Sequence, residues 1–210
     1  LTLTKLSKKR TLEGISNLIN KKSFIGGQEV EKFQKNFQDF NDSKYCLGVG
    51  NGTDAIEIAL ESLGLPENSE IIVPNFTFLS PAEAVIRGGY KLVLADIDLK
   101  DFNVSIESIK SIISKKTSAI IAVHLFGNPC NMSEILKLTK KYNIKWIEDC
   151  SQAHGAEFKG IKVGNFGDIG TFSFYPTKNL GAFGDSGAIV TNKKNIYEKA
   201  KKIANHGRID

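Results

Sequence analysis

The residue of greatest chemical interest is Lys178, in the segment SFYPTKNLG (173–181). It follows a predicted strand and lies in a loop flanked by aromatic residues and glycine. A lysine that is partly desolvated has a lowered pKa and can form a Schiff base with a carbonyl compound. Ser173 lies at the start of the segment, where its hydroxyl could donate a hydrogen bond to a phosphate oxygen. Composition alone favours an ordinary surface lysine, because the chain contains 28 lysines and arginines.

A carboxylate at the end of a predicted strand is the second candidate. In the segment WIEDCSQAHG (146–155), Asp149 follows the apolar strand residues. Burial of an acid is costly unless the acid has a partner, and a protonated pyridine nitrogen would be such a partner. The charged pair would keep the ring protonated and so preserve it as an electron sink. A solvated acid at a strand end is the alternative, and composition alone favours it.

The segment GNGTD (50–54) is the third candidate. Its glycines allow tight backbone conformations and the close approach of a ligand. Thr53 and Asp54 begin a predicted helix, and the unpaired N–H groups and dipole at a helix N-terminus favour a phosphate. A turn followed by an N-cap explains the same residues equally well. The order of the three segments is more informative, because a phosphate-type turn, a strand-end acid and a loop lysine follow one another along the chain.

The rest of the chain alternates between predicted strands and helices, a pattern typical of a mostly parallel sheet covered by helices. The predicted strands cover residues 45–49, 70–73, 91–96, 119–123, 144–148, 169–174 and 188–191. The predicted helices cover residues 28–40, 55–63, 80–87, 106–114, 133–142 and 196–204, and Ser133 is the expected N-cap of the fifth. We therefore predict an α/β fold, a three-layer sandwich with a mostly parallel central sheet.

Ligands of open α/β sheets gather at the carboxyl ends of the strands. The segments that follow the predicted strands are the ones rich in polar residues, at 51–54, 75–78, 124–128, 149–154 and 173–178. The three candidate segments are therefore expected at one edge of one sheet.

Composition excludes several classes of function. The net charge is +5, and the basic residues are scattered without an aromatic platform, so we predict no nucleic-acid partner. The chain has no apolar run of transmembrane length and no signal peptide, so we predict no membrane partner. Three cysteines form no CxxC pair, which favours a reducing compartment, and we expect the cytoplasm. The three histidines are widely spaced, so no metal site is predicted.

Longer stretches of the chain carry a family resemblance. The most specific is IEDCSQAHGAEFKGIKVGNFGDIGTFSFYPTKNLGAFGDSGAIVTN (147–192). Shorter ones are FIGGQEVEKF (24–33), GVGNGTDAIEIAL (48–60), IIVPNFTFLSPAEAV (71–85), ADID (95–98), VHLFGNPCNM (123–132) and NHGR (205–208). Together they resemble the sugar aminotransferases of the DegT/DnrJ/EryC1/StrS family, within the fold-type I enzymes that use pyridoxal 5'-phosphate (PLP).

The resemblance implies the fold of the PLP-binding large domain and roles for two catalytic residues. Lys178 would form the Schiff base with PLP and then move a proton between cofactor and substrate carbons. Asp149 would pair with the pyridine nitrogen. Cys150 adjoins this acid, but period-two alternation turns it away, so we expect core packing rather than a nucleophile. His124 could pack in the core or line the site.

The resemblance also implies the residues that bind the cofactor, which are Gly52, Thr53, Asp54, Phe78, Asp149, Gln152, Ser173 and Lys178. The first three would hold the phosphate through the helix N-terminus, and Ser173 would add its hydroxyl. Gln152 would lie near the ring and its 3-hydroxyl. Phe78 would stack on the ring, although Phe76 competes for that role. The substrate residues that we expect are His154, Tyr175 and Asn179.

An aminotransferase of this family would take an amino group, from glutamate in our interpretation, and pass it to a nucleotide-linked keto sugar. The sequence around Lys178 favours amination at C3 of a dTDP-3-keto-6-deoxyhexose over amination at C4 or amination of a UDP-linked sugar. A PLP-type sugar dehydratase and a non-catalytic regulatory relative are alternatives. Retention of the lysine counts against both, since some dehydratases carry histidine there and a regulator does not need the amine. A dinucleotide-binding dehydrogenase lacks support, because no GxGxxG follows the first strand.

The resemblance also gives an expected domain organisation. Residues 1–25 form an N-terminal segment, and residues 26–210 form the PLP-binding large domain. The chain begins at Leu1 rather than Met and reaches Asp210 without the family's C-terminal small domain, so we expect a fragment. The full-length form is expected to be a homodimer.

Overall fold

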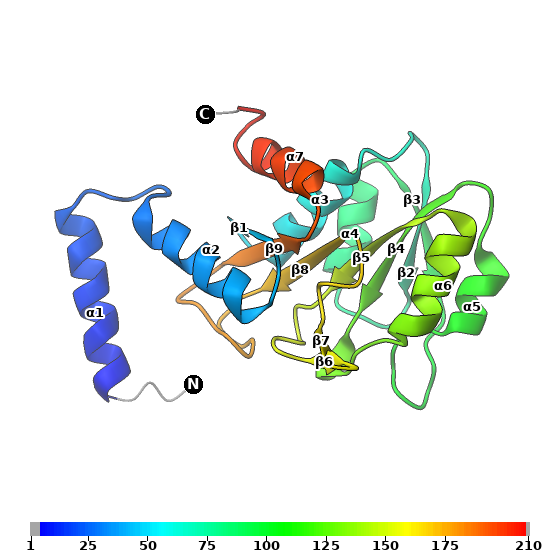
Figure 1. Cartoon of the computed structure of the whole chain (residues 1–210), viewed down its shortest axis with the longest axis horizontal. Coiled ribbons are helices and arrows are strands. Elements are labelled where there is room, and N and C mark those ends of the chain that lie inside the picture. Colours follow the sequence, from blue (N-terminus) through cyan, green and yellow to red (C-terminus); the bar gives the residue numbers. More distant parts are fainter. Residues whose placement is uncertain (1–4, 209–210) are drawn as a thin grey trace.

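A seven-stranded sheet forms the centre of the computed structural model, which describes residues 5–208 (Figure 1). The strand order is β1-β9-β8-β5-β4-β2-β3. Strand β9 runs antiparallel to both of its neighbours, whereas the other pairings in this sheet are parallel. The strands are β1 (Tyr45–Val49), β2 (Glu70–Pro74), β3 (Lys91–Ala95), β4 (Thr117–Val123), β5 (Lys145–Asp149), β8 (Ile169–Ser173) and β9 (Gly187–Thr191). The predicted α/β fold with a mostly parallel sheet is confirmed.

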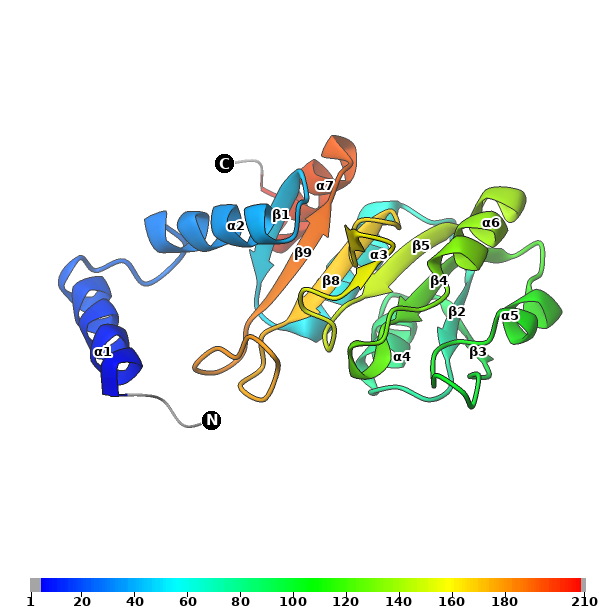
Figure 2. The same cartoon turned by 60° about the horizontal axis from the view of Figure 1, so that its bottom comes forward.

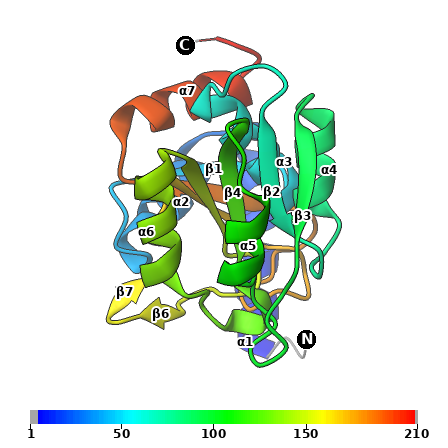
Figure 3. The ribbon, with the colours of Figure 1, turned by 90° about the vertical axis from the view of Figure 1, so that its right-hand side faces the viewer.

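Helices cover both faces of the sheet and complete the three layers. One face carries α3 (Gly52–Leu63), α4 (Ser80–Arg87) and α7 (Lys194–Ala204). The opposite face carries α2 (Gln28–Phe40), α5 (Ile106–Ile112) and α6 (Met132–Tyr142). Figure 3 shows α5 and α6 beside each other along the strands.

The two apolar layers follow from the alternation of side chains along each strand. In β2, Ile71 and Val73 pack on the side of α3 and α4, whereas Ile72 packs on the side of α5 and α6. Every residue of β2 is buried, because helices cover both faces. This double burial explains why the central strands read as nearly continuous apolar runs in the sequence.

Helix α1 (Lys5–Asn20) is an element that the sequence pattern did not predict. It lies within the expected N-terminal segment and extends away from the sheet (Figure 2). Leu12, Ile15 and Ile19 are exposed along it. No helix within residues 5–208 is long and apolar enough to cross a membrane. The division at residue 25 stays a prediction, and its residues 1–4 and 209–210 lie outside the described part of the chain.

The helix starts differ from the predicted ones in three places, and α7 begins at Lys194 rather than at residue 196. Helix α3 begins at Gly52 rather than at residue 55, because the side chain of Asn51 accepts a hydrogen bond from the Asp54 N–H and caps the helix. Helix α6 begins at Met132, and its N-cap is Asn131. Our prediction of Ser133 as this cap was wrong. The Asn131 side chain accepts from the Glu134 N–H three residues further on, so the helix has already begun at Ser133.

Three short elements were also missed. Strands β6 (Glu157–Phe158) and β7 (Ile161–Lys162) form a hairpin of their own. Both turn residues, Lys159 and Gly160, have positive φ angles, as a two-residue hairpin turn requires. The 3₁₀ turn η1 (Leu125–Gly127) follows β4. Each piece is too short for its hydrophobic periodicity to be read from the sequence.

Candidate active site

The carboxyl edge of the sheet is hollowed by a pocket of about 750 Å³. Strand ends contribute Val123 from β4, Asp149 from β5 and Ser173 from β8. The residues that we predicted to bind the cofactor all line it, namely Gly52, Thr53, Asp54, Phe78, Asp149, Gln152, Ser173 and Lys178. Tyr175, a predicted substrate residue, also lines it. The fold therefore brings the three candidate segments together, as the order of parallel strands requires.

The first turn of α3 forms one wall of the pocket. The Asn51 side chain accepts from the Asp54 N–H at 2.9 Å, and the Asn51 carbonyl accepts from the Ala55 N–H at 3.1 Å. Within residues 5–208, the N–H groups of Gly52 and Thr53 make no hydrogen bond. The Thr53 and Ser80 hydroxyls are 2.7 Å apart, which joins the N-termini of α3 and α4. Free N–H groups at a helix N-terminus are suited to an anion.

Gly52 is required by a close contact between α3 and β8. A Cβ atom added to Gly52 would lie 2.7 Å from Cβ of Ser173. Carbon atoms normally approach to about 3.5–4.0 Å, so no larger residue fits without movement of the backbone. The helix N-terminus consequently lies directly against the Ser173 side chain, where one anion could contact both.

Asp149 is buried at the end of β5, with 5% of its surface exposed. Its Oδ1 accepts a hydrogen bond from the Ser151 N–H at 3.0 Å. No hydrogen bond or ion pair to Oδ2 is found among the described residues. A buried carboxylate with an oxygen left over is suited to a cationic or N–H partner in the pocket.

The Gln152 side chain is held from outside the pocket. Its Oε1 accepts a hydrogen bond from the Phe126 N–H at 2.8 Å. Phe126 belongs to the turn η1 and has φ 55° and ψ 21°, a left-handed conformation that is uncommon for a residue with a side chain. The contact leaves the two N–H donors of the Gln152 amide for a ligand.

Lys178 lies in the loop between β8 and β9 and is half-buried. Its N–H donates to the Tyr175 carbonyl at 2.8 Å, which forms a turn directly after β8. The Ala182 N–H then returns to the Phe174 carbonyl at 2.7 Å. No ion pair holds the Lys178 amine within residues 5–208, so the amine can react with a ligand in the pocket.

His154 and Asn179, two of the predicted substrate residues, do not line the pocket. The His154 ring packs against Phe37, Phe172 and Phe174, with ring centroids 5.4–6.5 Å apart. Both of its nitrogens are buried, and neither makes a hydrogen bond within the described chain. Desolvation by burial lowers the pKa of His154 to about 4, so the imidazole is neutral near pH 7. A contact of His154 or Asn179 with a substrate stays a prediction.

Several residues that line the pocket were not predicted. Ser80, Glu83 and Arg87 come from α4, at a spacing of three and four residues that places them on one helical face. The same pattern was readable in the sequence, but nothing there showed that this face of α4 turns towards the pocket. Thr77, Ser151 and Thr177 directly adjoin predicted residues, and Asp185 lies further along the loop that carries Lys178.

Comparison with known proteins decides the family. The sequence model of the DegT/DnrJ/EryC1/StrS aminotransferase family matches residues 5–210. The chain belongs to this family. A relative from Acidithiobacillus ferrooxidans, a UDP-N-acetyl-3-dehydro-alpha-D-glucosamine 3-aminotransferase, is 41% identical over 93% of this chain and 53% of its own. Another, the dTDP-3-amino-3,6-dideoxy-alpha-D-galactopyranose transaminase of Aneurinibacillus thermoaerophilus, is 39% identical over 95% of this chain and 55% of its own.

Solved structures of the family share the fold. An aminotransferase from Psychrobacter cryohalolentis superposes with a TM-score of 0.93 at 35% identity, over 99% of this chain and 52% of its own. A GDP-4-keto-6-deoxymannose-3-dehydratase with a trapped PLP-glutamate geminal diamine superposes with a TM-score of 0.88 at 31% identity, over 93% of this chain and 52% of its own. The chain spans about half the length of the curated relatives that it matches. The family and the fold inferred from the sequence are confirmed.

Proposed function

We propose that this chain is the cofactor-binding part of a PLP-dependent aminotransferase that acts on a nucleotide-linked keto sugar. The observation that carries the proposal is the convergence of Lys178, Asp149 and the N-terminus of α3 on one pocket. The family membership and the names of the relatives support the same activity.

The α3 side of the pocket suits the phosphate of PLP. The N–H groups of Gly52 and Thr53 would donate to phosphate oxygens, and the helix dipole favours the negative charge. The Ser173 hydroxyl adds a donor, and so does one of the paired hydroxyls of Thr53 and Ser80, since the other donates within that pair. No backbone rearrangement is needed for this, because the cap at Asn51 leaves those two amides free.

Asp149 and Gln152 suit the ring of the cofactor. The unoccupied Oδ2 of Asp149 would accept a hydrogen bond from the protonated pyridine nitrogen. The Gln152 amide, oriented by Phe126, would donate to the 3-hydroxyl oxygen. Phe78 is 70% exposed at the pocket and would stack on the ring. When bound, PLP supplies the electron sink that makes the substrate carbon acidic.

Lys178 would attach PLP through its amine and would then act as the acid and base of the reaction. When it does not hold the cofactor, Nζ would accept a proton from one carbon and deliver it to another. Its place in the pocket, together with Asp149 and Gln152, supports this role. Tyr175 and Thr177 flank the lysine in the pocket and would contact the substrate.

The amino donor that we propose is glutamate, and the acceptor is a dTDP-3-keto-6-deoxyhexose. The dehydratase neighbour trapped with PLP-glutamate supports the donor. The names of two relatives place the amino group at C3 of the sugar, which is UDP-linked in one and dTDP-linked in the other. They therefore support amination at C3 more strongly than they support dTDP as the nucleotide. The accompanying proposals are a homodimer in the full-length form and a cytoplasmic location.

A titration with PLP tests the proposal. Purified protein should develop an absorption band at the edge of the visible region when PLP is added. Lys178→Ala should abolish the band, and Lys137→Ala, which removes an exposed lysine of α6, should leave it unchanged. If the wild-type protein gives no band, or if the band survives in Lys178→Ala, the proposed site is wrong.

The acceptor requires a second experiment. Protein loaded with the pyridoxamine form of the cofactor is mixed separately with dTDP-linked 3-keto, dTDP-linked 4-keto and UDP-linked 3-keto sugars. Return of the PLP band should be fastest with the dTDP-linked 3-keto sugar. A faster return with either of the other two would reassign the carbon or the nucleotide without affecting the assignment of Lys178.

A further inference from the structure

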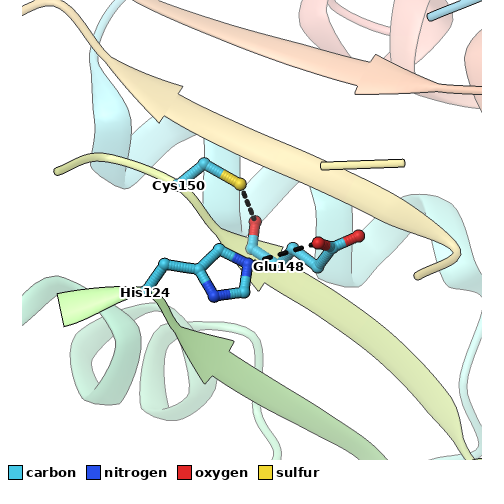
Figure 4. Close-up of side chains that lie close together, drawn as sticks. All are labelled: His124, Glu148 and Cys150. Carbon is cyan, nitrogen blue, oxygen red and sulfur yellow. Dashed lines mark hydrogen bonds and ion pairs between the residues drawn. The ribbon is translucent and has the colours of Figure 1, made fainter. Parts of the chain in front are cut away.

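A buried polar cluster lies behind the pocket, on the face of the sheet that carries α5 and α6. Its members are His124, Glu148 and Cys150, and each is 0% exposed (Figure 4). Glu148 precedes Asp149 on β5, and successive strand residues point to opposite faces. The cluster is therefore on the other side of the strand from the carboxylate that lines the pocket.

The Glu148 carboxylate is fully occupied by hydrogen bonds. Its Oε1 accepts from the N–H groups of Phe166 and Gly167 at 2.7 and 2.6 Å. Its Oε2 accepts from the Gly164 N–H at 2.8 Å and pairs with Nε2 of His124 at 3.2 Å. The ligand atoms of the cluster lie within 4.8 Å of one another, a spacing that would suit a metal ion. Four donors already use the four acceptor sites of the carboxylate, so the geometry favours a structural network instead.

The hydrogen bonds of His124 define its protonation. The Cys130 N–H points at Nδ1 with a distance of 3.2 Å, which requires that nitrogen to carry no proton. The hydrogen-bond partners of the ring raise its pKa above the ordinary value, which favours a second proton, but a proton on Nδ1 would face the Cys130 N–H and that hydrogen bond would be lost. The ring is therefore the tautomer whose Nε2–H donates to Glu148. One ring links β5 to the turn that follows β4.

That turn contacts the pocket residue Gln152 from outside the pocket. The backbone N–H of His124 donates to the Asp149 carbonyl at 3.0 Å, and η1 begins at the next residue. The Phe126 N–H then holds Oε1 of Gln152. Asn103, which is 2% exposed, fixes the turn from the other side, since its Oδ1 accepts from the Leu125 N–H at 3.3 Å. The strained φ of Phe126 persists only where its surroundings hold it.

We infer that Glu148 and His124 are positioning residues that orient Gln152 towards the cofactor through the turn η1. They touch neither cofactor nor substrate. The inference rests on the proposed function, because it assigns the orientation of Gln152 to PLP binding. In the cofactor-free chain, the buried pair of Glu148 and His124 already orders the Phe126 amide.

The test is Glu148→Gln, which keeps the shape of the side chain but turns one acceptor oxygen into an N–H₂ donor. That donor would replace either Oε2, which accepts from Gly164 and His124, or Oε1, which accepts from Phe166 and Gly167. In either case two buried donors would lose their acceptor. We expect PLP affinity, measured by absorption titration, to fall about tenfold. In the Gln152→Ala background the same substitution should cause no further loss, because interacting residues do not add.

Two further variants complete the test. Glu70→Gln is the matched control, because Glu70 is also a buried carboxylate that accepts hydrogen bonds, from Ser114 and Lys91. It begins β2 and so lies at the amino end of a strand, away from the pocket at the carboxyl ends. The substitution should leave PLP affinity unchanged. Should Glu148→Gln fail to fold, Asn103→Ala loosens the same turn and is expected to show the same dependence on Gln152.

Hydrogen exchange of the Phe126 amide in the cofactor-free protein separates this inference from the proposed function. Exchange should be faster in Glu148→Gln than in the wild-type and Glu70→Gln proteins. Unchanged exchange, or an equal loss of PLP affinity with and without Gln152, would overturn the inference. If the wild-type protein binds no PLP, the proposed function and the role of Gln152 in it are lost, and exchange alone decides whether the buried pair orders the turn.

Discussion

The contact between Gly52 and Ser173 can be tested with one added methyl group. In Gly52→Ala, Cβ would begin 2.7 Å from Cβ of Ser173, roughly 1 Å closer than a relaxed carbon contact. Strand β8 is buried along its whole length and cannot yield, so the first turn of α3 must move outward. Overpacking of this kind costs about 1–3 kcal/mol.

Thermal unfolding and PLP titration together measure the effect of Gly52→Ala. The melting temperature should fall by about 2–4 °C for each kcal/mol lost. PLP affinity should fall as well, because the displaced helix N-terminus carries the free N–H groups that we assign to the phosphate. Gly14→Ala is the control, since an added Cβ there meets no atom within 4 Å, and it should not destabilise the protein. A Gly52→Ala protein with wild-type stability and wild-type PLP affinity would refute the reasoning.

Three other predictions follow from the same geometry. Asn51→Ala removes the cap of α3 and should cost about 1 kcal/mol in urea unfolding, whereas Asn51→Asp should retain most of the stability. The pKa of His154 is lowered from 6.5 to about 4, so only the unfolded chain binds its proton between those values. The free energy of unfolding should therefore fall as the pH drops from about 6.5 to about 4, and His154→Phe should reduce that slope; an identical slope would contradict the assignment. Burial raises the pKa of Cys46 and Cys150 to about 12, so iodoacetamide should label neither in the native protein, as judged by mass spectrometry, and rapid labelling without denaturant would contradict their burial.

Sequence reasoning succeeded best where the signal is local and periodic. The bounds of α2, α4 and β1 agree with the predicted ranges, because apolar spacing and turn residues lie within each segment. Cys150 was expected in the core from period-two alternation, and its complete burial confirms this. The prediction of the α6 N-cap was wrong for a local reason too. Asn131 and Ser133 are both good N-cap residues, and the sequence does not show which one the chain uses.

The sequence by itself determined the alternation of strands and helices, the order of the phosphate-type turn, the acid and the lysine, and the family that these residues indicate. Only the tertiary structure decided which side chains share a space. It placed His154 among Phe37, Phe172 and Phe174 rather than in the pocket, and it turned one face of α4 towards the residues that we propose bind the cofactor. It also gave Glu148 its donors from the 164–167 loop and from His124, which follows β4. Such contacts join residues distant in sequence, and their partners are set by strand order and helix orientation, which no local pattern contains.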